Sequence, residues 1–150
     1  MNNELKYIFK FFFVLFILLI IFDKLSFVFI YLDKIFLGLL GARVKGDYVA
    51  LVHGYDISKI CSGSIIIATT LALIISDQFK KKLIRALFCF VVLFFYNVIR
   101  IYFVLIYGTI FHIISWMFFI IIVLGTWYLS IKLFLDDKPQ NSSQTTEGFV

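Results

Sequence analysis

Long apolar runs alternate with short polar segments along the chain, and their lengths predict helices that cross a membrane. The runs cover residues 7–22, 60–75, 83–107 and 111–135. A helix of about 20 predominantly apolar residues crosses the hydrocarbon core of a bilayer, which is ~30 Å thick. We therefore expect an all-α integral membrane protein, a small bundle of about four transmembrane helices.

The first run predicts an uncleaved helix rather than a signal peptide. Only Lys10 interrupts it, and it is followed by Asp23 and Lys24 instead of the small residues that a signal peptidase requires. Lys6 and Lys10 at its beginning favour a cytoplasmic N-terminus.

Residues 25–42 are apolar with a different pattern. Asp33 and Lys34 lie at the centre, where a spanning helix would bury their charges in lipid. The apolar residues recur at helical spacing while the polar ones fall elsewhere, which is typical of a helix lying in the membrane interface. We predict one interfacial helix here. The alternative is a further crossing, which would move the following segment to the cytoplasmic face.

Turn-forming residues change the pattern between residues 41 and 59. Gly41, Gly46, Asp47 and Gly54 surround a short apolar alternation at 48–52. This arrangement predicts a short extracytoplasmic loop or hairpin in water.

The charges between the runs predict the orientation in the membrane. Three lysines at 80–82 and Arg85 follow the second run and indicate a cytoplasmic loop. Four crossings then place both termini in the cytoplasm. The chain divides into a single transmembrane domain over residues 1–135 and a disordered cytoplasmic tail over residues 136–150. The predicted location is the cell (cytoplasmic or inner) membrane.

Composition narrows the class of protein further. Hydrophobic residues make up 63% of the 150 residues and charged residues 15%, against roughly 45–50% and 25% in soluble domains. These proportions exclude a soluble globular enzyme, a disordered chain and a secreted disulfide scaffold. The predicted topology accounts for most of the net charge of +5, so we expect no nucleic-acid partner. The sequence has no paired-cysteine or two-histidine metal spacing, and we expect no metal or organic cofactor.

Polar residues near the outer ends of the third and fourth runs are the first candidates for chemistry. Arg100 lies roughly 10 Å below the end of its helix, where a charge is costly unless it is paired or lines a wet cavity. Asn97 lies one turn earlier on the same face. After a turn at Gly108, His112 begins the next helix on the same side of the membrane. The alternatives are an Arg100 that extends to the lipid headgroups and a His112 that only packs.

Cys61 opens the second run, where the free N–H groups of a helix N-terminus favour a thiolate. With Arg100 and His112 it would supply a nucleophile, an anion stabiliser and a general acid/base at one membrane face. The alternative is a small packing residue, which is our prediction for Cys89. We expect the two cysteines near opposite membrane faces, too far apart for a disulfide. Weaker candidates in the outer loop are His53, Tyr55 and Asp56.

These residues form three ordered motifs that resemble the exosortase and archaeosortase transpeptidases of bacterial and archaeal membranes. Cys61-Ser62-Gly63 is similar to the Cys-Ser-Gly nucleophile motif of that family, and residues 97–101 resemble its Asn-x-x-Arg-Ile motif. His112 falls where the family has its third catalytic residue. The resemblance covers residues 37–135, without the extra helices and periplasmic domain of larger members.

The resemblance implies a cysteine-dependent transpeptidase or protease of the extracytoplasmic membrane face. Cys61 would form a thioester, Arg100 would stabilise negative charge and His112 would move protons, with Ser62, Gly63 and Asn97 in supporting or substrate-binding roles. Its substrates would be exported proteins that end in a short sorting motif, a hydrophobic helix and a basic tail. The acceptor would be water, a lipid or a polysaccharide, with membrane lipid as the surrounding partner.

Two other classes of protein stay open on the sequence. One is a non-catalytic membrane assembly or scaffolding protein, in which Cys61, Arg100 and His112 stabilise helix packing. The other is a membrane thiol enzyme that moves acyl chains and would carry a lipid adduct on Cys61. Thiol reactivity separates the first from a peptidase, because a packing cysteine is inert.

Overall fold

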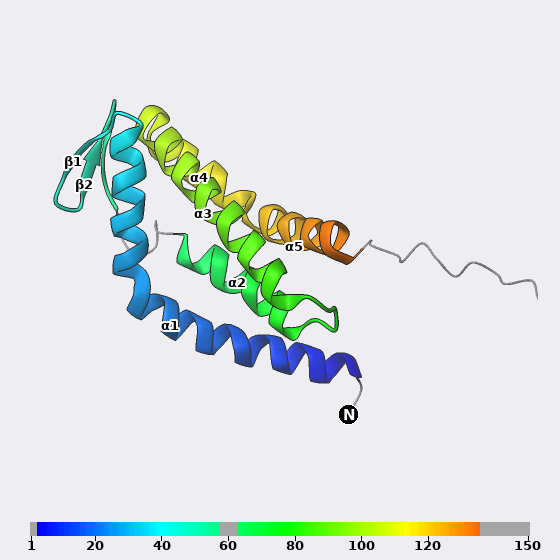
Figure 1. The fold of residues 1–150 in the computed structure, drawn as a ribbon. Helices are drawn as coiled ribbons and strands as arrows, with labels where there is room; N and C mark the ends of the chain where they lie inside the picture. The colour runs from blue at the N-terminus through cyan, green and yellow to red at the C-terminus, as the bar shows by residue number, and fades with distance from the viewer. Residues whose placement is uncertain (1–2, 58–62, 136–150) are drawn as a thin grey trace, which may run out of the picture.

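The computed structural model describes residues 3–57 and 63–135, which are mostly helical (Figure 1). The helices are α1 (Asn3–Leu39), α2 (Ser64–Ser76), α3 (Lys82–Tyr107), α4 (Thr109–Met117) and α5 (Phe119–Leu135). Two helices, α1 and α3, are long and apolar enough to cross a membrane, and the bent pair α4 and α5 makes a third if it counts as one span. The helical class agrees with the sequence prediction.

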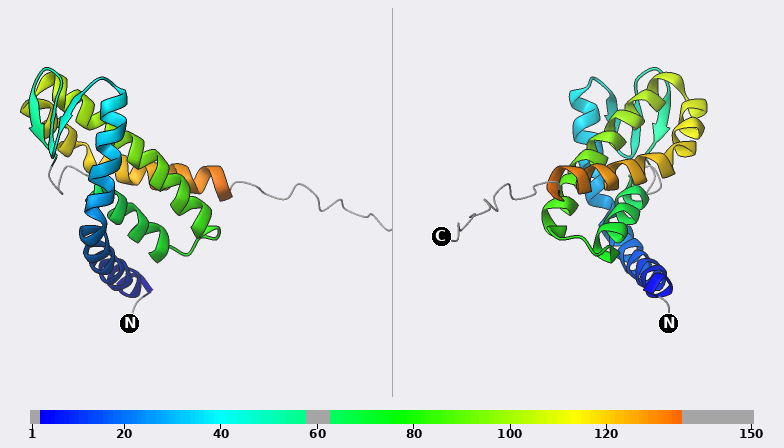
Figure 2. Two further views of the ribbon diagram at one scale, coloured as in Figure 1. Left: turned by 60° about the vertical axis from the view of Figure 1, so that its left-hand side comes forward. Right: turned by 90° about the vertical axis from the view of Figure 1, so that its right-hand side faces the viewer.

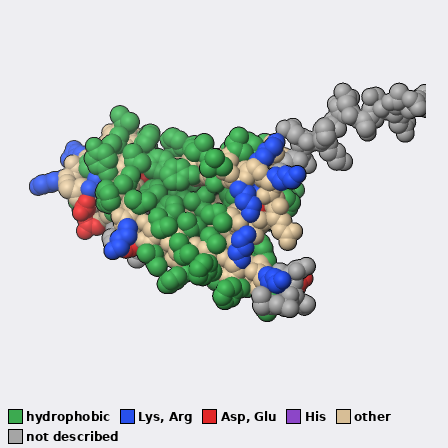
Figure 3. Space-filling view, turned by 60° about the horizontal axis from the view of Figure 1, so that its bottom comes forward, with side chains coloured by type: hydrophobic (Ala, Val, Ile, Leu, Met, Phe, Trp, Pro, Cys, Tyr) green, Lys and Arg blue, Asp and Glu red, His purple; other side chains and the backbone are tan. Residues whose placement is uncertain are grey.

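An exposed apolar face covers much of the molecule. Figure 3 shows this face as a broad hydrophobic area with Lys and Arg side chains gathered at its two ends. Many large apolar side chains on α1 and α3 are more exposed than a soluble protein tolerates, among them Phe9, Phe12 and Leu83 at 71%, 62% and 87%. A bilayer covers such a surface without cost, because lipid tails are as apolar as leucine.

Helix α1 corrects the first part of the prediction. The expected break at Asp23 and Lys24 is absent, and residues 25–42 do not form a separate helix. The two charged side chains point outward, and the segment contains neither glycine nor proline before Gly38, so nothing stops the helix. The Ser26 hydroxyl donates to the Asp23 carbonyl at 2.8 Å, a contact that bends helices. Figure 1 shows that α1 bends but does not fold back on itself.

Glycine ends α1 in the way that the sequence indicates. Gly41 has φ 90°, and its N–H donates to the Gly38 carbonyl at 3.0 Å while the Ala42 N–H donates to the Leu37 carbonyl at 2.9 Å. This is a Schellman motif, in which a left-handed glycine satisfies the last carbonyls of a helix.

The predicted hairpin is present and contains three strands. β1 (Arg43–Lys45), β2 (Tyr48–Ala50) and β3 (Gly54–Asp56) pair antiparallel in sequence order. The sheet lies against the end of α3, because the N–H groups of Val52 and His53 donate to the Leu105 carbonyl at 3.3 and 2.8 Å. We call this end of the molecule the sheet end.

Helix α2 is a core helix. Its 13 residues span about 20 Å at 1.5 Å per residue, less than the predicted crossing over residues 60–75 requires. It contacts α1, α3 and α5, and Figures 1 and 2 show it lying between them. Ile67, Ala68, Thr70, Ala72 and Ile74 are fully buried. Residues 58–62 lie outside the described ranges.

The fourth predicted helix, over residues 111–135, is also corrected. The chain forms α4 and α5, which meet at an angle of 51° next to Phe118. The Ser115 hydroxyl donates to the His112 carbonyl at 2.7 Å, one turn back in α4. Such a bond competes with the regular helix ladder and favours a bend. The tail at 136–150 lies outside the described residues.

Candidate functional site

Arg100 is buried inside the helical bundle. Its side chain is 4% exposed, and Nη2 donates to Asn97 Oδ1 at 3.1 Å. Nη1 lies 3.2 Å from His112 Nδ1. Because a guanidinium only donates, His112 accepts this bond at Nδ1, and a neutral ring then carries its proton on Nε2. The structure thus favours the interior polar site over an arginine that extends to the lipid surface.

Two local features bring these three side chains together. Asn97 and Arg100 are three residues apart on the same face of α3. Gly108 then ends α3 with φ 77° and ψ −162°, a conformation open to glycine, and α4 begins at the next residue. Four residues later His112 lies beside Arg100, as the turn in the sequence predicts.

The described part of the Cys-Ser-Gly motif packs directly on Asn97. Gly63 has φ 72° and precedes α2. A Cβ atom added there would lie 2.7 Å from Asn97 Cγ, so both the backbone conformation and the close approach require glycine. Cys61 and Ser62 lie outside the described residues.

Asp33 on α1 belongs to the same site, and the sequence analysis missed it. Its side chain is 0% exposed, and Oδ2 accepts a hydrogen bond from Asn97 Nδ2 at 3.1 Å. The sequence analysis assigned it to the polar face of an interfacial helix. The useful signal was the cost of a charge at the centre of an apolar run, which marks a functional or paired group. We call Asp33, Asn97, Arg100 and His112 the Arg100 cluster.

Aromatic rings surround the exposed side of the Arg100 cluster. Tyr55 of β3 lies 5.8 Å from the His112 ring between centroids, and Trp116 lies 5.8 Å from Arg100 Cζ. Of the three weaker candidates, Tyr55 alone has a described contact with the cluster. His53 packs on Gly108, and Asp56 is exposed.

An apolar cavity of about 360 Å³ lies beside Arg100, between α3 and the bent pair. Its walls are mostly hydrophobic and aromatic, and include Tyr96, Phe103, Phe111 and Phe118. A buried guanidinium next to such a cavity can stabilise an anion without competition from water. Within the described ranges no three His, Cys, Asp or Glu side chains converge as a metal ion requires.

A second polar cluster lies at the opposite end of the bundle and corrects the assignment of Arg85 to a solvated loop. Arg85 is 0% exposed, and its Nη2 donates to Asp77 Oδ2 at 2.7 Å. Nε donates to Ser130 Oγ at 3.2 Å, and Trp127 Nε1 donates to Asp77 at 3.1 Å. We call these four residues the Arg85 cluster. Lys80 and Lys81 are exposed, as a loop requires.

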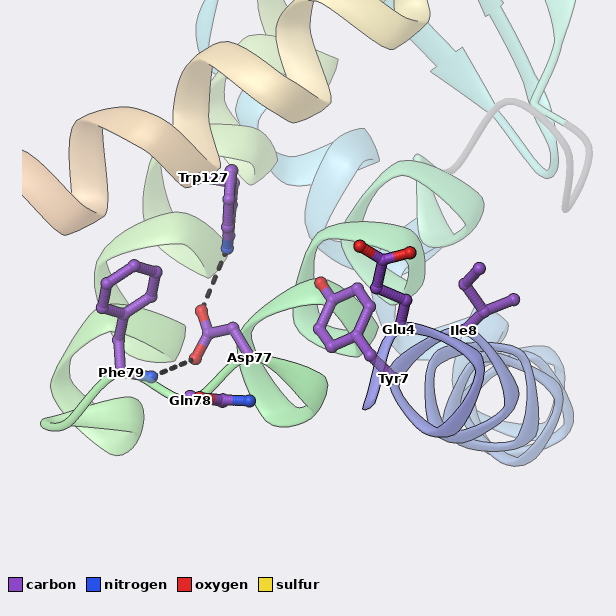
Figure 4. A pocket seen from close by; sticks show the side chains of 7 residues that line it. All are labelled: Glu4, Tyr7, Ile8, Asp77, Gln78, Phe79 and Trp127. Atoms are coloured by element: carbon purple, nitrogen blue, oxygen red, sulfur yellow. Dashed lines mark hydrogen bonds between the residues drawn. The ribbon is translucent and has the colours of Figure 1, made fainter. Parts of the chain in front are cut away.

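Another cavity, of about 710 Å³, adjoins the Arg85 cluster (Figure 4). Trp127 and the backbone of Phe79 both point to the Asp77 carboxylate, while Tyr7, Ile8 and Glu4 of α1 form the other wall. None of the residues that line it is a predicted site residue. Asp77 already accepts bonds from Arg85, Trp127 and the Phe79 N–H, so its charge is satisfied within the fold.

Cys89 is the packing residue that the sequence predicts. It is a free thiol with 0% exposure, and its Sγ lies 3.7 Å from the Thr126 carbonyl oxygen.

No protein-family model, curated protein or solved structure matches the chain. Its function is therefore argued from the motifs and from the geometry of the Arg100 cluster.

Proposed function

We propose that this protein is a membrane cysteine transpeptidase or protease, similar to exosortases, that cleaves C-terminal sorting signals of exported proteins at the extracytoplasmic face. One observation carries the proposal: a buried guanidinium contacts both His112 and Asn97, and Asn97 packs against the glycine of the Cys-Ser-Gly motif. A nucleophile, an anion stabiliser and a proton carrier from three separate motifs would then share one site.

The continuity of α1 supports this location. α1 is one continuous helix of 37 residues that bends without folding back, and we propose that it crosses the membrane once. The proposed cytoplasmic N-terminus then puts the sheet end outside. We propose that α2, although short, belongs to the second crossing and that α3 and the bent pair α4–α5 are the third and fourth, which return the C-terminus to the cytoplasm.

The proposed reaction begins with transfer of the Cys61 thiol proton to His112. His112 accepts that proton at Nδ1, so Arg100 Nη1 leaves this nitrogen and turns to the new anion. The thiolate attacks the carbonyl carbon beside the sorting motif, and Arg100 stabilises the resulting oxyanion. The C–N bond then breaks, the amine takes the proton from His112, and a thioester on Cys61 is left.

The second half of the reaction releases the thioester. Neutral His112 takes a proton from an incoming water, lipid or polysaccharide hydroxyl, whose oxygen attacks the thioester carbonyl. The Cys61 thiolate leaves and recovers its proton from His112. This chemistry requires no cofactor.

The membrane supplies the proximity that a soluble protease obtains from a cleft. The sorting signal's hydrophobic helix holds the scissile bond at the depth of the Arg100 cluster. The apolar cavity beside Arg100 accommodates side chains of such a substrate.

Mass spectrometry of exported proteins in the native host tests the proposal. The wild type is compared with Cys61→Ala, Arg100→Ala and His112→Ala, with Cys89→Ala as the matched cysteine control. We expect hydrophobic tails to persist in the first three variants and to be removed in the wild type and in Cys89→Ala. If all strains trim alike while the proteins accumulate normally, the residues only support packing, and the scaffolding function replaces the enzyme.

A further inference from the structure

Burying the Asp33 carboxyl group costs free energy, and few hydrogen bonds offset that cost. Its side chain is fully buried in the middle of α1. Oδ2 accepts one hydrogen bond, from Asn97, and Oδ1 has no hydrogen-bond partner among the described residues. An apolar residue of similar volume is commonly neutral or stabilising in place of a buried charge. This burial therefore points to a role beyond packing.

The neighbouring lysine does not neutralise Asp33. Lys34 points away and pairs with Asp47 in the turn between β1 and β2, with Nζ 2.5 Å from Oδ1. Arg100 is separated from Asp33 by the Asn97 amide, which bonds to both. The carboxylate thus acts on the arginine through the amide.

The two neighbours of Asn97 fix the orientation of its amide. Arg100 only donates, so it must face Oδ1, and Asp33 Oδ2 accepts the bond from Nδ2 at the other end of the amide. Without an acceptor at position 33, the NH₂ group would point into an apolar helix interface and the amide would gain by turning. Any such turn takes Oδ1 away from Arg100 Nη2.

We propose that Asp33 is a positioning residue for Arg100, acting through Asn97. Asp33 holds the amide so that Oδ1 anchors Arg100 Nη2, while Nη1 exchanges between His112 and the anion formed in the reaction. This inference rests on the proposed transpeptidase function and adds α1, 64 positions away in the chain from Asn97, to the framework of the site.

Two neutral replacements of Asp33 separate the hydrogen bond from the charge. Asp33→Asn keeps an acceptor for Asn97 without an ionisable group, whereas Asp33→Leu removes both the acceptor and the ionisable group and keeps the branching at Cγ. We expect Asp33→Leu to slow tail removal about 10- to 100-fold, the loss typical when an outer hydrogen bond to a functional group is deleted. Asp33→Asn keeps most of the activity. The rate is measured by pulse-chase mass spectrometry in the native host, per amount of membrane-inserted protein.

Asn97→Leu keeps the test decisive if Asp33→Leu does not accumulate. This variant interrupts the same chain of bonds one step later and must reproduce the loss. The double variant Asp33→Leu/Asn97→Leu must be no slower than Asn97→Leu alone, because both changes break one path.

Four outcomes overturn the inference. Two of them are trimming at the wild-type rate by Asp33→Leu or by Asn97→Leu. The third is an Asp33→Asn variant that loses as much activity as Asp33→Leu, which assigns the effect to charge. The fourth is a double variant slower than Asn97→Leu. Failure of the proposed function itself has a different signature, because the wild type and Cys61→Ala then trim alike and neither Asp33 variant differs from them.

Discussion

The Arg100 cluster and the Arg85 cluster both bury an arginine between helices, yet they use it in opposite ways. Arg85 forms a two-nitrogen contact with Asp77, whose carboxylate also accepts bonds from Trp127 and the Phe79 N–H. Arg100 bonds to a neutral amide and an imidazole, and its nearest buried carboxylate lies beyond the amide. The first arrangement is an ion pair with a carboxylate, whereas the contacts described for the second join the guanidinium to neutral groups.

The difference separates stability from chemistry. The Arg85–Asp77 salt bridge fixes the packing of α2, α3 and α5, and the hydrogen-bonding groups of both partners are already occupied, so they do not bind a substrate. A guanidinium held by neutral acceptors contributes less to folding, but it can exchange a partner during a reaction. Loss of the first arginine should therefore unfold the protein, and loss of the second should stop its chemistry.

The largest effect is expected from Arg85→Ala. It leaves the Asp77 carboxylate buried without its counter-ion, which costs about 3–5 kcal/mol of stability. We expect a strongly lowered unfolding midpoint in detergent and poor accumulation in the membrane. Adding Asp77→Leu should recover part of the loss, because the orphaned charge is removed. A double variant less stable than Arg85→Ala would show that the pair does not act as a unit.

Arg100→Lys should have the next largest effect, on rate rather than on stability. A lysine keeps the charge but cannot contact Asn97 and His112 with two nitrogens in one plane. Tail removal should fall roughly 100- to 1,000-fold, or about 2.7–4 kcal/mol, as for other lost anion stabilisers. The unfolding midpoint should stay close to that of the wild type. Full activity in Arg100→Lys would mean that charge alone is sufficient.

Gly63→Ala should have the smallest of the three effects. It tests whether a change at the glycine that packs on Asn97 slows the reaction. Alanine at φ 72° is strained, by about 1–2 kcal/mol, and its Cβ would displace Asn97. Gly46→Ala is the matched control, because φ is 61° there and open space surrounds the added Cβ. We expect both variants to lose stability, Gly63→Ala more because its Cβ meets Asn97, and the reaction to slow in Gly63→Ala only. Equal trimming rates would separate Gly63 from the site.

The sequence predicts the features that local pattern determines. Helix α3 follows from an unbroken apolar run, the turn follows from Gly108, and together they bring His112 back to Arg100. A short loop or hairpin after α1 follows from the glycines and the short alternation around them, although its third strand does not. In each case the signal and its consequence lie within a few helical turns.

The features that the sequence does not predict depend on distant partners. Asp33 appears as a polar residue of an interfacial helix until Asn97 is placed beside it. Arg85 resembles a loop cation because its partner, Asp77, belongs to the preceding helix end and Ser130 to α5. The bend at Phe118 has no glycine or proline to mark it. Charge counting assigns such residues to solvent, because it does not include buried partners.

The contact between the sheet and α3 has a consequence for synthesis. The Leu105 carbonyl is one of the last in α3, and it receives its hydrogen bonds from Val52 and His53, about fifty residues earlier in the chain. Those residues leave the ribosome first, so the sheet can form before α3 emerges. Lipid offers no hydrogen-bond donor to such a carbonyl, whereas the N–H groups of Val52 and His53 do. The two donors are thus synthesised before the carbonyl group that accepts their hydrogen bonds.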